Sequence, residues 1–191
     1  MTSDTRVMLP QLDPTTWQLE TERLILRAPQ QHEGAAVNAA ICESFEELKL
    51  WMPWAKTPPT VEESEAVSVK AHEEFRAGID FSVRLWLKDG TFVGGSGLHR
   101  GNRAIPSFEI GYWCRTSLTR QGYISEAVQA LTAFGFESFH AKRLEIRCDS
   151  RNIASRKVAE KCGFAFEAML KNYERANDGT LRDVFIFARF P

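Results

Sequence analysis

A glycine between an extended segment and a helical segment is the feature of this sequence best suited to binding an anion. Residues 109–113 read as a strand, and residues 119–127 open a helix with Gly122 at the junction. Unpaired amides at a helix start and the helix dipole both favour negative charge. Gly122 has no Cβ to hold phosphate oxygens away, and Arg120 adds a cation. The pattern indicates a pyrophosphate site, although glycines at such junctions mostly serve as turns.

A second segment combines polar side chains with a helix start. Asn152 stands at the expected cap and Ser155 falls in the first turn, while Gly163 follows Cys162 at the other end. The structural interpretation is simple capping at both ends, which requires no ligand. The functional interpretation places the amide and the hydroxyl in a binding site, and both interpretations can hold together.

The elements that must position these residues are alternating strands and helices. Extended character is predicted for 17–26, with a turn near Glu22, and for 81–87, 92–93, 108–115, 144–148, 164–169 and 184–190. Asp89-Gly90 and Asn177-Asp178-Gly179 predict hairpin turns. Helices are expected at 30–42, 45–50, 60–77, 122–139 and 152–162, the third of them opened by a Thr60 and Glu63 capping box. An apolar stripe on 122–139 should pack on a sheet.

Together, the strand–glycine–helix junction and the Asn-x-x-Ser helix resemble the GNAT superfamily of acyl-CoA-dependent N-acyltransferases. Residues 21–27 and 109–113 look like two strands of its ribosomal-protein N-terminal (serine/alanine) acetyltransferase branch, and the likeness covers about residues 17–190. The resemblance implies an α/β (α+β) fold in one domain. Its central mixed, mostly antiparallel twisted sheet of six to seven strands, flanked by helices, would be splayed between the fourth and fifth strands. We expect a leader at 1–16 and the domain at 17–191.

The resemblance also assigns a binding site for acetyl-CoA, which would be a co-substrate. Its phosphate loop corresponds to residues 119–124, and backbone near the splayed strands would bind the pantetheine arm. The residues implied are Trp113, Cys114, Arg115, Arg120, Gln121, Gly122, Tyr123, Ile124, Ser125 and Asn152. Thr119 and Ile124 depart from the loop pattern, and Ala159 stands where many members carry a proton-donating Tyr. The first two departures bear on cofactor affinity, and the third bears on proton donation.

Direct transfer in a ternary complex is the mechanism that we expect. An ammonium acceptor must lose a proton before it attacks a thioester. Glu109 is the candidate base, since the resemblance places its strand beside the thioester, and the alternative is a carboxylate in a surface ion pair. With Ala159 unable to donate, Ser155 is the candidate acid toward the departing thiolate, or a group that only orients it. Trp51, Met52, Pro53 and Trp54 either flank the acceptor groove or simply pack.

Composition limits the partners. The 24 basic and 25 acidic residues of this 191-residue chain nearly cancel, so neither nucleic acid nor an anionic membrane is an expected partner. There is no secretion signal and no run long enough to span a bilayer, and four scattered cysteines suit reduced thiols in the cytoplasm. The four histidines lack ligand spacing, so no metal is expected.

The acceptor is less constrained than the reaction. The branch resemblance favours a protein N-terminal amine, such as that of a ribosomal protein, with polyamines, amino-sugars and metabolite amines as alternatives. Glu43, Glu46 and Glu47 could line a groove for a basic tail. A CoA-binding sensor without catalysis is a further alternative. The apolar strand ending at Phe190 could pair with a second subunit in a homodimer.

Overall fold

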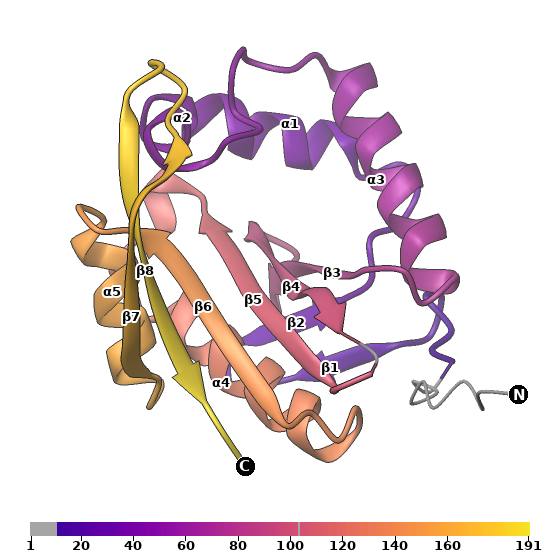
Figure 1. Cartoon of the computed structure of the whole chain (residues 1–191). Helices are drawn as coiled ribbons and strands as arrows, with labels where there is room; N and C mark the ends of the chain where they lie inside the picture. The colour runs from indigo at the N-terminus through magenta and orange to yellow at the C-terminus, as the bar shows by residue number, and fades with distance from the viewer. Residues whose placement is uncertain (1–10, 103) are drawn as a thin grey trace, which may run out of the picture.

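An eight-stranded sheet forms the centre of the computed structural model, which describes residues 11–102 and 104–191 (Figure 1). The strand order is β1-β2-β3-β4-β5-β6-β8-β7, and all neighbours are antiparallel except β5 and β6. The strands are β1 Gln18–Glu20, β2 Leu24–Arg27, β3 Phe81–Leu87, β4 Phe92–Asn102, β5 Ser107–Cys114, β6 Arg143–Asp149, β7 Ala165–Arg175 and β8 Leu181–Arg189.

The sheet therefore has one strand more than the six to seven expected. The expected turn near Glu22 splits residues 17–26 into the two paired strands β1 and β2, because the amide of Thr21 bonds the carbonyl of Leu24 at 2.9 Å. The remaining expected strands are all present, and several are longer than their sequence pattern indicated. Residues 92–93, for example, begin a strand that continues to Asn102.

The sheet opens between β5 and β6, which are the fourth and fifth strands if residues 17–26 count as one. These parallel strands pair only from Ser107 to Glu109 against Arg143 to Glu145. Beyond that point β5 continues beside β4 to Cys114, while β6 continues beside β8 to Asp149. The expected splay is confirmed, and it leaves one edge of β5 without a partner strand after Glu109.

Helices cover both faces of the sheet, with α1, α2 and α3 arching over one face and α4 and α5 on the other (Figure 1). The main core packs α4 against the sheet, and a smaller core seats α1 on it beside Phe92. The helices are α1 Gly34–Glu43, α2 Phe45–Trp51, α3 Val61–Arg76, α4 Tyr123–Glu137 and α5 Ile153–Lys161, with a short 3-10 helix at Thr116–Leu118. No helix among the described residues is both long and apolar enough to cross a membrane.

Local signals set the helix boundaries. The Thr60 hydroxyl accepts the amide of Glu63 at 3.1 Å, and the Glu63 carboxylate accepts the amide of Thr60 at 2.8 Å, so the predicted capping box is confirmed. The first helix begins at Gly34, four residues later than position 30. A Cβ at Gly34 would lie 2.7 Å from the Cβ of Glu65, so only glycine permits this approach of α1 to α3.

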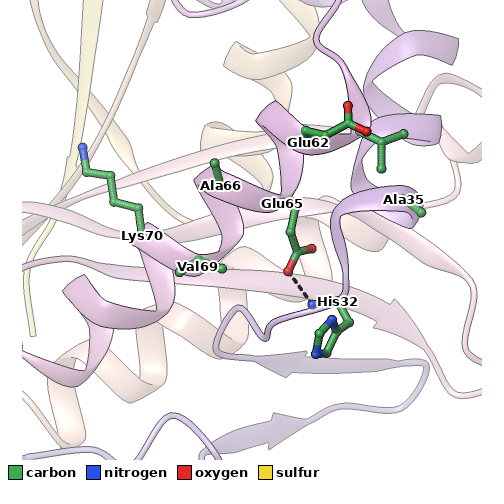
Figure 2. A pocket seen from close by; sticks show the side chains of 8 residues that line it. His32, Ala35, Glu62, Glu65, Ala66, Val69 and Lys70 are labelled. Atoms are coloured by element: carbon green, nitrogen blue, oxygen red, sulfur yellow. Dashed lines mark hydrogen bonds between the residues drawn. The ribbon is translucent and has the colours of Figure 1, made fainter.

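Glu65 ties the same two helices together. Its carboxylate accepts the amides of His32 at 2.6 Å and Gly34 at 2.7 Å, and Figure 2 shows it reaching from α3 to the start of α1. Amides at a helix start lack intrahelical acceptors, so this carboxylate caps α1 from another helix. The position of α1 over the sheet is thereby fixed.

The structure at the two ends of the chain differs from what the sequence analysis considered. The sequence analysis considered the final strand, β8, for pairing with a second subunit, but β8 lies between β6 and β7; the edge strands are β7 and β1. Within the leader predicted at 1–16, residues 1–10 lie outside the described residues. Pro14 is buried, and its carbonyl accepts a hydrogen bond from the Gln30 side chain at 2.6 Å.

Candidate active site

Two cavities share part of their lining where β5 and β6 diverge. The first, of about 170 Å³, lies beside α5 and is called here the α5-side cavity. The second, of about 540 Å³, lies below α1 and α3 and is called the α3-side cavity. Met52, Glu109, Gly111 and Tyr112 line both. Two molecules, one in each cavity, can therefore meet at these shared residues.

Glu109 occupies this junction. It belongs to the last residue pair between β5 and β6, opposite Glu145, and its side chain is only 15% exposed. The Arg147 Nε lies 3.6 Å from its carboxylate and 2.7 Å from that of Glu145. The ion pair considered from the sequence is thus present, but it lies at the meeting point of two cavities. A partly buried carboxylate with a cation at long range can accept a proton from a neighbouring ligand.

Asn152 and Ser155 come together in the α5-side cavity. The Asn152 side chain caps α5 by accepting the amide of Ser155 at 3.0 Å, and both residues line the cavity. The capping interpretation is confirmed. The hydroxyl of Ser155 lies 2.9 Å from that of Tyr112, whose hydroxyl also donates to the Ser155 carbonyl at 3.1 Å.

Tyr112 is a site residue that sequence reasoning missed, since it was assigned no role in binding or catalysis. Burial raises the pKa of its phenol, with the hydrogen bond from Ser155 acting in the opposite direction. The phenol therefore stays protonated at neutral pH. Ala159, where the resemblance expected a Tyr, is fully buried in the main core, so the hydroxyl beside Ser155 comes from β5 instead.

The junction before α4 gathers the residues predicted to bind phosphate. Gly122 adopts a left-handed conformation with φ 84°, as does Arg120 with φ 63°. The first helical bond runs from the amide of Glu126 to the carbonyl of Gly122 at 3.0 Å, so the amides of Tyr123, Ile124 and Ser125 precede it. Arg120 and Gln121 are exposed beside them.

Arg23, which lies in the turn before β2, contacts this junction. Its guanidinium donates to the carbonyl of Gln121 at 2.9 Å, pairs with Glu126 at 2.6 Å and lies 4.6 Å from the centre of the Tyr123 ring. These contacts fix the loop that presents the amides. The exposed cations and the free helix start suit a phosphate-bearing ligand.

The three remaining predicted binding residues end β5 in different environments. The guanidinium of Arg115 turns toward α1 and pairs with Glu43 at 2.5 Å, so its side chain does not enter the β5–β6 opening. Burial raises the pKa of the Cys114 thiol to about 11. Trp113 presents its indole to the α3-side cavity, 6.1 Å from the Trp54 ring. Trp113 and Cys114 belong to the part of β5 that has no partner strand on the β6 side.

Glycines on the sheet below the α3-side cavity leave room for aromatic rings to lie flat against the backbone. A Cβ at Gly97 would lie 2.5 Å from Cε1 of His99, and one at Gly95 would lie 2.7 Å from Nε1 of Trp113. The rings of His99 and Trp113 therefore lie directly over the sheet. The Nδ1 of His99 is 2.8 Å from the Asp80 carboxylate, which fixes the ring. Sequence reasoning considered the histidines as metal ligands and missed this pairing, because Asp80, just before β3, is 19 positions from His99 on β4.

The loop between α2 and α3 forms part of both cavities. Trp51, Met52 and Pro53 line the α5-side cavity, while Met52 and Trp54 line the α3-side cavity. The side chain of Asn177 donates to the carbonyls of Lys49, Met52 and Ala55 at 2.9, 2.9 and 3.2 Å. The aromatic cluster thus lines the cavities, and the β7–β8 turn holds it there.

The hollow in Figure 2 is separate from this site. It lies between α1 and α3, and none of its lining residues is shared with either cavity. Among the described residues, no three His, Cys, Asp or Glu side chains are grouped so that they could hold a metal ion. The junction of the two cavities therefore remains the candidate active site.

The sequence and the fold of this chain have counterparts among known proteins. The family model described as "Acetyltransferase (GNAT) domain" matches residues 23–165. The ribosomal-protein-serine acetyltransferase of Escherichia coli (strain K12) is 28% identical over 172 residues, which cover 88% of this chain and 93% of that protein.

Solved structures share the fold at lower identity. A ribosomal L7/L12 alpha-N-protein acetyltransferase, RimL, in complex with coenzyme A superposes with a TM-score of 0.85 at 23% identity, covering 91% of this chain and 98% of that one. The microcin C7 self immunity acetyltransferase MccE, in complex with acetyl-CoA and AMP, gives 0.83 at 19% identity over 90% and 94% of the two chains.

Proposed function

Since this chain belongs to the GNAT acetyltransferase family, we propose that it transfers the acetyl group of acetyl-CoA to a primary amine by direct attack in a ternary complex. The observation that carries the proposal is the meeting of two cavities at Glu109 and Tyr112, where β5 and β6 part. One cavity would receive the thioester and the other the amine.

The residues on the α5 side fit acetyl-CoA. The amides before Glu126 and the side chain of Arg120 suit the pyrophosphate, and left-handed Gly122 exposes the helix start. The unpaired edge of β5 at Trp113 and Cys114, together with Asn152, offers hydrogen bonds to the pantetheine arm. Backbone binding explains why the departures at Thr119 and Ile124 are compatible with this role.

On the α3 side, Glu109 accepts the proton that the acceptor ammonium must lose. The amine nitrogen then forms a bond to the thioester carbonyl carbon, and the carbon–sulfur bond breaks. The leaving thiolate takes a proton from the Ser155 hydroxyl, whose oxygen lies 2.9 Å from that of Tyr112. The two proton transfers thus take place on opposite sides of the reacting carbon.

For the acceptor we propose the α-amine of a protein or peptide. Support comes from the ribosomal-protein-serine acetyltransferase relative, which matches nearly its whole length. Small amines such as polyamines or amino-sugars are the alternative. Given the net charge of −1, we expect that the protein acts without nucleic acid or membrane. We also expect a cytoplasmic location. Sedimentation analysis would test assembly into a homodimer.

Release of free CoA from acetyl-CoA in the presence of an amine panel tests the proposal. The panel contains peptides with Ser or Ala at the N-terminus and polyamines, and acetyl-CoA binding is measured separately by calorimetry. Release that depends on one peptide supports both the reaction and its acceptor class. Release with polyamines alone supports the small-amine alternative. Binding without release from any amine favours a sensor, and absence of binding contradicts the proposal.

A further inference from the structure

A buried arginine faces the α3-side cavity without a full set of hydrogen-bond partners. Arg84 lies on β3, is only 8% exposed and lines the cavity. Its Nη2 is 3.4 Å from the Ser68 hydroxyl, which is long for a hydrogen bond, and its Nε has no partner among the described residues. A guanidinium has five donors, and leaving them unpaired in a buried position costs free energy.

The charges around Arg84 do not balance. Arg27 and Glu33 are its charged neighbours, and the Glu33 carboxylate is already paired with Arg27 and accepts the amide of Gln30 at 3.0 Å. Two guanidiniums thus share one carboxylate. Arg84 remains charged despite burial, because arginine is not deprotonated in proteins. The region can accommodate one more anion.

The other acidic groups of the cavity are occupied elsewhere. Glu63 caps α3 through the amide of Thr60, and Asp80, which lies outside the cavity lining, is paired with His99. Glu109 lies at the opposite end of the cavity, at the β5–β6 junction. No carboxylate of the described cavity lining therefore serves Arg84.

The sheet register sets the distance between Arg84 and Glu109. Arg84 is opposite Gly95, which is opposite Trp113, and Glu109 precedes Trp113 by four positions on the same face. The two Cα atoms are therefore separated by roughly 13 Å along the strands and about 10 Å across them. Between them the floor is formed by glycines overlaid by flat rings, so an extended chain can lie across it.

From this arrangement we infer that Arg84 binds a carboxylate of the acceptor, on a different residue from the reacting amine. The inference rests on the proposed function and deepens it, because it defines the acceptor as an acidic peptide. Planar pairing with a carboxylate satisfies the guanidinium donors and neutralises the surplus charge. The same geometry disfavours polyamines, which would bring further positive charge to Arg84.

Matched dipeptides test this inference on the intact protein. The acceptors are Ser-Glu amide, Ser-Gln with a free terminal carboxylate, and Ser-Gln amide. We expect kcat/KM to be higher by about 10- to 100-fold for at least one carboxylate-bearing acceptor than for Ser-Gln amide. Which of the first two is preferred identifies the source of the carboxylate.

Variants test whether Arg84 causes the preference for a carboxylate-bearing acceptor. In Arg84→Gln the advantage of the acidic acceptor should disappear, while acetyl-CoA binding is unchanged; Arg84→Lys should retain part of it. Arg76→Gln removes an exposed charge on α3 and is the control, with thermal melting to verify folding. Equal rates on all three dipeptides, or a preference that survives in Arg84→Gln, would overturn the inference. Absence of transfer to any amine would instead contradict the proposed function.

Discussion

The hydroxyl oxygens of Tyr112 and Ser155 lie 2.9 Å apart, one on β5 and the other in the first turn of α5. This pair joins the two elements that border the α5-side cavity. If Tyr112 donates to Ser155, the proton of the Ser155 hydroxyl is left to point at a ligand. The pair therefore supplies a protonated group at the position where a thiolate would leave.

Replacement Tyr112→Phe should lower kcat by about 10-fold and leave the KM for acetyl-CoA nearly unchanged. The loss of kcat is limited because the Ser155 hydroxyl, which donates the proton, is still present in this variant. The double variant with Ser155→Ala should be no slower than Ser155→Ala alone, because residues acting as a unit are not additive. Additive losses in steady-state kinetics would show that the two hydroxyls act independently.

The pH profile provides a second check on Tyr112. Burial raises the pKa of its phenol, so the group stays protonated through neutral and mildly alkaline solution. We expect no loss of kcat from its ionisation between about pH 7 and pH 9, the range below the ordinary tyrosine pKa of ~10. A decline in this range that is absent in Tyr112→Phe would contradict the assignment.

Replacement Glu109→Gln should reduce kcat by about 100-fold, because the amide cannot accept the acceptor's proton. Acetyl-CoA binding, measured by calorimetry, should persist. The matched control is Glu145→Gln, the neighbouring carboxylate that also contacts Arg147. If both variants lose activity equally, the role of Glu109 is to organise the ion pair, not to accept a proton.

Replacing the glycines of β4 and β5 by alanine should lower stability to an extent that depends on what each new Cβ would contact. A Cβ at Gly97 would lie 2.7 Å from the carbonyl oxygen of Phe81, which cannot move easily, whereas a Cβ at Gly111 meets only the His99 ring at 3.2 Å. Gly97→Ala should lower the free energy of unfolding by about 1–3 kcal/mol, and Gly111→Ala by less. Urea denaturation of the two variants measures the order; a reversed order would refute the explanation.

Removing the Asn177 side chain should loosen the loop between α2 and α3. Three carbonyls of residues 49–55 then lose their donor, and amides of this loop should exchange faster with deuterium. We expect the KM for the acceptor to rise several-fold, since the loop lines both cavities. Arg175→Ala, which disturbs the same turn through Gly179 without touching the loop, is the control.

Asp80 should make the free energy of unfolding depend on pH. Burial alone would raise the pKa of its carboxyl, but the hydrogen bond and charge of His99, with Ser82, outweigh burial and lower it. A lowered folded-state pKa contributes stability that is present above the unfolded value of about 3.9 and is lost as the pH falls through the folded value. Asp80→Asn should therefore destabilise the protein at neutral pH and have little effect near pH 2. Urea titrations at both pH values test this.

Local patterns determined much of this protein from the sequence alone. The capping box of Thr60 and Glu63, the Asn152 cap and the glycine turns involve residues within a few positions of one another. Their hydrogen bonds join residues that are near one another in the chain, so element type and approximate limits follow from the sequence. The family resemblance, carried by two such segments, added the splayed sheet and the region of the site.

Only the tertiary structure decided which side chains meet. Tyr112 and Ser155 are 43 positions apart, and Arg84 faces Glu109 only through the register of three strands. Strand register and the face on which each residue lies depend on packing the whole sheet against two layers of helices, and a shift by one residue would exchange the faces. The hydroxyl pair, the unpaired arginine and the inner position of β8 could therefore not be read from spacing.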